Sequence, residues 1–323
     1  MTTASESKIA SLEDAGLGRE PINIQVSKTR ETLRALRRNR SAIVGFTILM
    51  MLIFVAVFAP VLRTHDPVKP LIGIEDVKKR EGPCIHLLGC PQDRPQHFFG
   101  IDGNVRDVYS RVLYGARLSL IIGFTTVTFA IIIGTLLGVM AGFFGGWSDN
   151  GIMRVMDVLL AFPSLLLAIA IVTVLGTGLI NALLAIGIVS IPIYARVVRS
   201  NVLVIREMDF ISASQALGAS KMHLMIRRIL PNSLTPLIVA GTLGVATAIL
   251  DAAALSFLGL GAQPPDPEWG LMVGQEYKNI FNAPHLVLFP GVALMLTVLA
   301  FNLLGDGLRD ALDPRLASKR GGS

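Results

Sequence analysis

The sequence predicts an all-α membrane protein with six transmembrane helices. Of its 323 residues, 52% are hydrophobic and only 16% are charged, whereas a soluble domain usually carries about 25% charged residues. Six apolar stretches are each long enough, at roughly 20 residues, to cross a hydrocarbon core about 30 Å thick. These stretches lie near residues 41–62, 116–142, 155–176, 179–201, 233–258 and 286–305.

The first apolar stretch is predicted to be a retained membrane span. Residues 1–40 are polar, and the run that begins at Ser41 is too long for the apolar region of a signal peptide. No small-residue cleavage site follows it. We therefore expect a polar N-terminal segment, 1–40, followed by a first transmembrane helix, 41–62.

Basic residues predict that both termini are cytoplasmic. Lys and Arg concentrate in the segments that would then lie inside, most densely in a cluster just before the first span: Arg34, Arg37, Arg38 and Arg40. The predicted extracytoplasmic loop 63–115 is also basic, but it is long and balanced by acids, so the rule has little force there. A five-helix core, 116–305, and a cytoplasmic tail, 306–323, complete the predicted organisation.

Prolines and glycines mark the predicted helices. Four prolines fall within or near the later spans, where neighbouring helices can satisfy the backbone groups that proline frees: Pro163, Pro192, Pro236 and Pro290. Gly134, Gly138 and Gly142 lie on one helix face and permit close helix approach. We expect this stripe to pack inside the bundle, with dimerisation as the lesser alternative.

The loop 205–231 is the most informative segment for function. It is polar, is predicted to lie inside, and is too long for a simple turn between spans. Its first part has apolar residues at helical spacing: Phe210, Ala213, Ala216 and Leu217. Gly218 then predicts a helix stop or sharp turn, and a second helical piece, 220–230, runs into Pro231. Two helices joined by a glycine would form a lever that moves the adjoining spans.

This loop resembles the EAA loop of ABC importer permeases. Ser212-Ala213-Ser214 stands at the Glu-Ala-Ala positions, Gly218 at the glycine and Leu230-Pro231 at the end. Ser212 in place of Glu, and Arg228 in place of Ile, depart from the pattern, and both fit the peptide-permease branch. The resemblance assigns ATPase coupling to Phe210, Ser212, Ala213, Ser214, Ala216, Leu217, Gly218, Ala219, Lys221, Leu230 and Pro231.

The resemblance extends over nearly the whole chain after residue 30. The segment GIDGNVRDVYSRVLYGARLSL is similar to the stretch before the second span of dipeptide and oligopeptide permeases. Matching positions are Gly100, Asp102, Arg106 and Asp107; Ile101 and Val105 replace the usual Thr and Gly. GFFGGWSDNGIMRVMD, ILDAAALSFLGLGAQPPDPEWG and FNLLGDGLRDALDPR resemble further hallmarks. The chain looks like the C-type permease of a dipeptide/oligopeptide/nickel-type importer.

That resemblance implies a type I ABC importer permease fold, facing inward, in the plasma or inner membrane of a bacterium or archaeon. It implies a heterodimer with a homologous permease, two cytoplasmic ATP-binding subunits and an extracytoplasmic solute-binding protein, besides the surrounding lipid. The implied cargo is a di- or oligopeptide, with nickel or another small solute as the alternative.

The chain itself is predicted not to be an enzyme. It contains no G-x-x-x-x-G-K-[ST] phosphate loop, no H-E-x-x-H and no G-x-S-x-G. We expect no catalytic residue, no cofactor, and ATP hydrolysis on separate subunits; nor is there a nucleic-acid-binding signature. A self-sufficient secondary transporter is the rival class, but it predicts inverted repeats and broken helices with paired ionisable residues, and no internal repeat is found.

Three acidic residues of the predicted spans need partners or roles. Asp251 lies within the fifth span, where a charge is costly; either Ser/Thr or backbone donors hold it, or it lines the path or a gate. Asp157 is expected to pair with Arg154, and Asp306 with Arg309, at helical spacing.

The predicted outer segments hold two further features. Cys84 and Cys90 are the only cysteines, and we expect a disulfide between them. Their spacing with His86 and His97 fits zinc poorly, so no metal site is predicted. The proline-rich segment 262–277 contains Trp269, and either contacts the binding protein, covers the path or anchors at the membrane interface.

Overall fold

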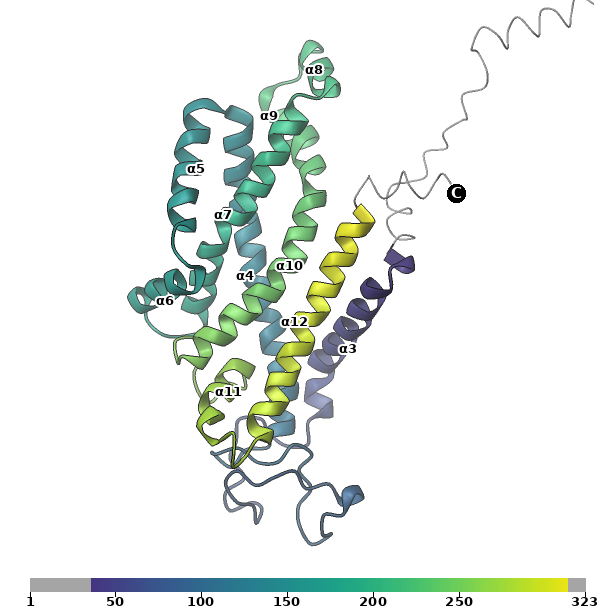
Figure 1. Cartoon of the computed structure of the whole chain (residues 1–323), viewed down its shortest axis with the longest axis vertical. Helices are drawn as coiled ribbons and strands as arrows, with labels where there is room; N and C mark the ends of the chain where they lie inside the picture. Colours follow the sequence, from purple (N-terminus) through teal and green to yellow (C-terminus); the bar gives the residue numbers. More distant parts are fainter. Residues whose placement is uncertain (1–35, 313–323) are drawn as a thin grey trace, which may run out of the picture.

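The computed structural model describes residues 36–312, and within them it is helical, with two isolated β-bridges and no strand. The all-α prediction is confirmed. Five long helices run along the molecule (Figure 1): α3 Arg40–Leu62, α4 Val108–Phe144, α7 Leu179–Arg206, α10 Leu230–Phe257 and α12 His285–Leu312. Shorter helices are α5 Gly146–Leu160, α6 Ser164–Leu175, α8 Asp209–Ala216, α9 Lys221–Leu224 and α11 Trp269–Glu276.

The long helices match five of the predicted spans in position, apolar character and length. Some extend past the predicted limits, because polar residues can join a helix once caps satisfy its ends. The clearest case is α4, which starts at Val108 because the Asp107 side chain caps it and accepts a hydrogen bond from Ser110 N at 2.8 Å. Pro192, Pro236 and Pro290 lie inside helices, as predicted.

The third predicted span, 155–176, is not one straight helix. The chain forms α5 and α6, which bend by 93° at a short break. Pro163 stands at this break as the residue before α6, where its ring and missing N–H end the preceding helix. At 1.5 Å per residue each half is roughly 18–22 Å long, too short to cross a bilayer alone.

The bent pair nevertheless returns the chain along the bundle. Gly178 N, just before α7, donates to Leu260 O at 3.1 Å, so α7 begins level with the end of α10. Both α4 and α7 therefore run toward the end that carries α8 (Figure 1). We call this the α8 end and the opposite one, built from residues 63–107 and α11, the loop end.

The two limits of the described chain lie together. Asn39 Nδ2 donates to Asp310 Oδ2 at 3.1 Å, which brings the start of α3 to the finish of α12, both toward the α8 end (Figure 1). Most of the predicted segments 1–40 and 306–323, with Arg34, lies outside the described residues.

The glycine stripe forms the seam between α4 and α7. A Cβ added to Gly138 would lie 2.5 Å from the Ala195 carbonyl oxygen, and one added to Gly142 would lie 2.8 Å from Val202 Cβ. Gly134 meets Tyr194 and Ile191 in the same way. The stripe therefore packs inside the bundle, as predicted, because only glycine lets the two backbones come this close.

Candidate functional site

The predicted coupling loop lies at the tip of the α8 end (Figure 1). After α7 the chain turns at Glu207, forms α8, turns again at Gly218 and enters α9. Ser220 caps α9 by accepting from His223 N at 3.3 Å. The predicted helix–glycine–helix arrangement is thus present in this region.

Gly218 adopts a backbone conformation that L-residues rarely take. Its φ is +83°, and no atom lies within 4 Å of an added Cβ. The turn is closed by Gly218 N bonding to Gln215 O at 2.9 Å and Ala219 N bonding to Ser214 O at 3.1 Å. Glycine is therefore required by backbone conformation, while the space around it is open for another molecule.

One side chain holds α8 against the rest of the protein. Ile211 is fully buried, together with Leu224 and Ile229 of the following segment. The residues predicted as the apolar face point to solvent instead: Leu217 is 89% exposed, and Phe210 is also exposed. The sequence analysis did not predict that Ile211 is the buried contact of α8. The one feature that could have indicated it is that Ile211 is the β-branched aliphatic residue of this helix.

The other predicted coupling residues are also accessible. Ser214 Oγ donates to Phe210 O at 2.7 Å, within the helix. Most of the set is exposed and none of it is buried: Ser212, Ala213, Ala216, Lys221 and Pro231 are exposed, whereas Ser214, Ala219 and Leu230 are half-buried.

The second helical piece is not a separate helix that stops at Pro231. Helix continues from Lys221 to Phe257, with a π-helical turn at Met225–Ile229. Pro231 follows the π-helical turn directly, so the wider turn takes up the place where the proline provides no N–H. Leu230 N reaches back to Met225 O, and Ser233 Oγ donates to Ile229 O at 3.0 Å. A motion of α8 and α9 would therefore act directly on α10.

Helix α5 is joined to α7 by ion pairs. Asp149 accepts from Arg199, with Oδ2 and Nη2 2.6 Å apart, and Asp157 pairs with Arg196. The predicted Asp157–Arg154 pair is wrong, because the fold brings a cation from another helix closer. Among the described residues, Asp306 and Arg309 form no ion pair either.

Asp251 is half-buried on α10. Within residues 36–312 its carboxylate receives no hydrogen bond and forms no ion pair. The Ser, Thr or backbone donors considered from the sequence are thus not seen among the described residues.

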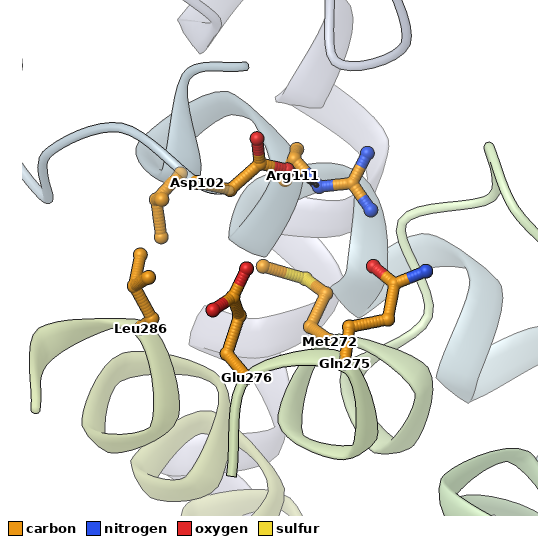
Figure 2. Close-up of a pocket in the computed structure, with 7 residues that line it drawn as sticks. Asp102, Arg111, Met272, Gln275, Glu276 and Leu286 are labelled. Atoms are coloured by element: carbon orange, nitrogen blue, oxygen red, sulfur yellow. Dashed lines mark ion pairs between the residues drawn. The ribbon is translucent and has the colours of Figure 1, made fainter. Parts of the chain in front are cut away.

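Buried charges hold the loop end together. Asp102 accepts from Arg106 Nε at 2.8 Å and lies 3.5 Å from Arg111 Nε. Arg111 also donates to Pro67 O at 2.9 Å and Pro265 O at 3.2 Å. Figure 2 shows Asp102 and Arg111 across a small cavity from Glu276. The motif residues that resembled peptide permeases therefore form a structural clamp.

A second clamp joins α11 to the loop. Glu276 accepts from Arg80 Nε at 2.8 Å and from Gly103 N at 3.0 Å. Glu268 caps α11 by accepting from Gly270 N at 2.9 Å and Leu271 N at 2.7 Å. Burial raises the pKa of Glu268, although these two hydrogen bonds act in the opposite direction.

Trp269 is not an interfacial anchor. It is 1% exposed, and its Nε1 donates to Val112 O at 3.0 Å. The indole packs beside Gly115, so α11 is bound firmly to α4. Elsewhere in the loop end, Cys84 and Cys90 are joined as a disulfide with Cα atoms 5.4 Å apart.

Known proteins with similar sequences identify the family. The protein-family model described as "Binding-protein-dependent transport system inner membrane component" matches residues 134–318. A second family model, described as "N-terminal TM domain of oligopeptide transport permease C", matches residues 27–77. A dipeptide transport system permease protein of Alkalihalophilus pseudofirmus is 50% identical, covering 91% of this chain and 92% of that protein. A glutathione transport system permease protein of Pectobacterium atrosepticum is 43% identical over 90% of this chain and 92% of its own length.

The fold agrees with the sequence relatives. A chain of the MetNI methionine ABC transporter, solved in inward-facing conformations, superposes with a TM-score of 0.52 at 21% identity, covering 63% of this chain and 97% of that one. This likeness concerns the fold alone. The family matches and the apolar helices make this chain a multi-pass permease that belongs to the family of inner membrane components of binding-protein-dependent transport systems.

Proposed function

We propose that the chain is one of two homologous permease subunits of an ATP-driven importer, and that α8 couples it to a separate ATPase. The observation that carries this proposal is the placement of α8. This helix stands at one end of the bundle, is held by Ile211, and exposes Phe210 and Leu217. An apolar helix face of this kind fits a hydrophobic groove on a soluble partner.

The coupling would act through α10 and α7. Helix α8 adjoins both, by a short turn to α7 and through the continuous helix from Lys221 to α10. A push on α8 would therefore displace two of the helices that pack around α4. Since hydrolysis needs a phosphate cradle that this sequence lacks, we assign ATP binding to two partner subunits.

The α8 end is proposed to face the cytoplasm. Arg37 and Arg38 lie just before α3 at this end, and Arg40 is its first residue. Lys221, Arg227 and Arg228 follow α8 along the chain. Cations at membrane ends favour the cytoplasmic side. The loop end would then be extracytoplasmic, where a solute-binding protein would deliver the cargo.

The proposed cargo is a di- or oligopeptide. Its support is that similar permeases are described as dipeptide and glutathione transport proteins. Nickel or another small solute is the alternative, because selectivity would reside largely in the binding protein. Asp251 has no partner in the described chain, and we assign it to the path or gate shared with the second permease.

A secondary transporter is the weaker alternative. The bend between α5 and α6 is a broken helix of the kind such transporters use. Here, however, Asp149 and Asp157 of α5 already pair with Arg199 and Arg196 of α7. They leave no free carboxylate on α5 for a coupling ion.

The deciding experiment is Gly218→Asp in the assembled transporter, with Gly146→Asp as the matched control. Both glycines have positive φ and open space around an added Cβ, but Gly146 lies at the α4–α5 turn, outside the loop. We expect Gly218→Asp to insert normally and to lose ATPase association or substrate-stimulated hydrolysis, while the control retains both. If the Gly218→Asp variant binds the ATPase and transports cargo as well as the wild type does, α8 is not the coupling element.

A further inference from the structure

Three residues of the segment between α3 and α4 meet at the loop end. His65 follows α3, Glu75 lies in the loop, and His97 precedes α4. His65 Nε2 is 3.0 Å from Glu75 Oε1, and His97 Nε2 is 2.9 Å from Glu75 Oε2. One atom from each residue lies within 4.8 Å of the others.

The buried carboxylate of Asp107 orients the His97 ring. Asp107 is fully buried, and its Oδ1 lies 3.0 Å from His97 Nδ1. Its other oxygen accepts from Ser110 N as the cap of α4. A carboxylate can only accept here, so His97 Nδ1 carries a proton. The Nε2 atom of His97 is therefore available toward Glu75.

The same carboxylate orients His65 through a hydroxyl. Thr64 Oγ1 donates to Asp107 Oδ2 at 3.1 Å, so its lone pairs face other donors. His65 Nδ1 lies 3.0 Å from this hydroxyl and donates to it. Both imidazoles thus direct Nε2 at Glu75, with Nδ1 held by a partner, which is the usual arrangement of histidines that bind metals.

This arrangement calls for positive charge between the three side chains. Two acceptor nitrogens facing carboxylate oxygens repel unless a cation separates them. Two protons, one on each imidazole, or a single divalent ion would neutralise the charges of Glu75 and Asp107. A divalent ion satisfies both nitrogens and the Glu75 carboxylate at one point.

We propose that His65, Glu75 and His97 bind one divalent transition-metal ion, for which Zn²⁺ is the best match. Two imidazoles and a carboxylate are a common zinc ligand set, with bonds of about 2.0–2.1 Å. At a tetrahedral centre such bonds place ligand atoms roughly 3.3 Å apart. The two histidine nitrogens lie 2.9 and 3.0 Å from different oxygens of Glu75, and one atom from each residue lies within 4.8 Å of the others, so binding one ion requires these side chains to draw together. His65 and Glu75 are 21% and 22% exposed, which gives an ion and a fourth, water ligand access. Imidazole nitrogens disfavour Ca²⁺ and Mg²⁺.

The proposal replaces the expectation of no metal, which rested on the cysteines. Cys84 and Cys90 are joined to each other, and His86 Nε2 lies 2.9 Å from Arg94 O. Only His97 of that earlier set takes part. The ion would tie the end of α3 to the loop and, through Asp107, to the start of α4.

The test is zinc binding by the full-length chain, purified without a polyhistidine tag and stripped with a chelator. We expect calorimetry and elemental analysis to give one Zn²⁺ per chain, with no competition from Mg²⁺. His97→Gln should abolish stoichiometric binding, and Thr64→Val should weaken it by roughly 10- to 100-fold, as outer-shell losses do. His86→Gln, in the same loop, is the matched control and should bind as wild type. Failure of the wild type to bind, or unchanged binding by His97→Gln, would overturn the site.

A second measurement avoids variants that fail to fold. X-ray absorption of the zinc-loaded wild-type chain should show nitrogen and oxygen ligands at about 2.0–2.1 Å, with imidazole scattering. Sulfur at about 2.3 Å would place the zinc on the cysteines and refute the assignment. Zn²⁺ should also raise the melting temperature of the wild type but not that of Glu75→Gln; an equal rise in both would count against the site.

Discussion

The two ends of this molecule are held together in different ways. At the loop end, charged side chains are buried and joined to one another, as Asp102, Arg106 and Arg111 are. At the α8 end, apolar side chains such as Leu217 and Phe210 are exposed. A buried network of paired charges holds the loop end together, and this end also exposes apolar side chains such as Leu87 and Phe281. Helix α8 is held by one buried side chain, Ile211, and presents Phe210 and Leu217 to solvent. The loop end is therefore tied together by many contacts, whereas α8 has few and is suited to a partner that moves it.

The largest effect expected from this contrast is all-or-none labelling of the two ends. In a Cys84→Ser, Cys90→Ser background, cysteine at Ser220 should react only from the cytoplasm and cysteine at Phe281 only from outside. Both positions are exposed. Reversed labelling would invert the proposed orientation, and labelling of both from one side would contradict the placement of the two ends.

Next in size is the loss of a buried cation. Arg111→Met should lower the free energy of unfolding by about 3–5 kcal/mol, because it removes a buried charge that pairs with Asp102 and leaves the Pro67 and Pro265 carbonyls without their donor. Thermal unfolding in nanodiscs measures this. Arg94→Met, at a pair whose arginine is largely exposed, is the control and should change stability by less than about 1 kcal/mol. Equal effects would mean that the loop end is not held by its buried charges.

At the α8 end, the matching change should affect binding and leave folding intact. Leu217→Asp should weaken association with the ATPase by roughly 2 kcal/mol or more, as the loss of a central apolar contact does. Leu87→Asp, equally exposed but at the loop end, is the control. Co-purification and titration of the ATPase would measure both. A similar loss in the two variants would show that α8 is not a special docking face.

The smallest effect concerns the disulfide. Cys84→Ser should lower stability by about 2 kcal/mol, because the closed loop is short and its entropic contribution is correspondingly small. Mass spectrometry of non-reduced peptides should find Cys84 linked to Cys90 in protein from an oxidising compartment. Two free thiols there would refute the prediction.

Much of the coupling region could be predicted from local pattern. The helical spacing from Phe210 to Leu217 and the stop at Gly218 both depend on residues within a few turns, and the structure contains both. The continuous helix through Pro231 could not be predicted in this way. It depends on the π-helical turn at Met225–Ile229, in which Leu230 N bonds to Met225 O, and residue spacing alone does not indicate such a turn.

The sequence by itself determined the all-α class, the positions of five of the six predicted spans and the glycine seam, because apolar length and residue spacing are local properties. Only the tertiary structure decided which charges meet. It joined Asp157 to Arg196 of another helix, and it collected His65, Glu75 and His97 around one point. Coulomb and metal-ligand interactions depend on distance in space, and chain folding brings together groups that no sequence spacing relates.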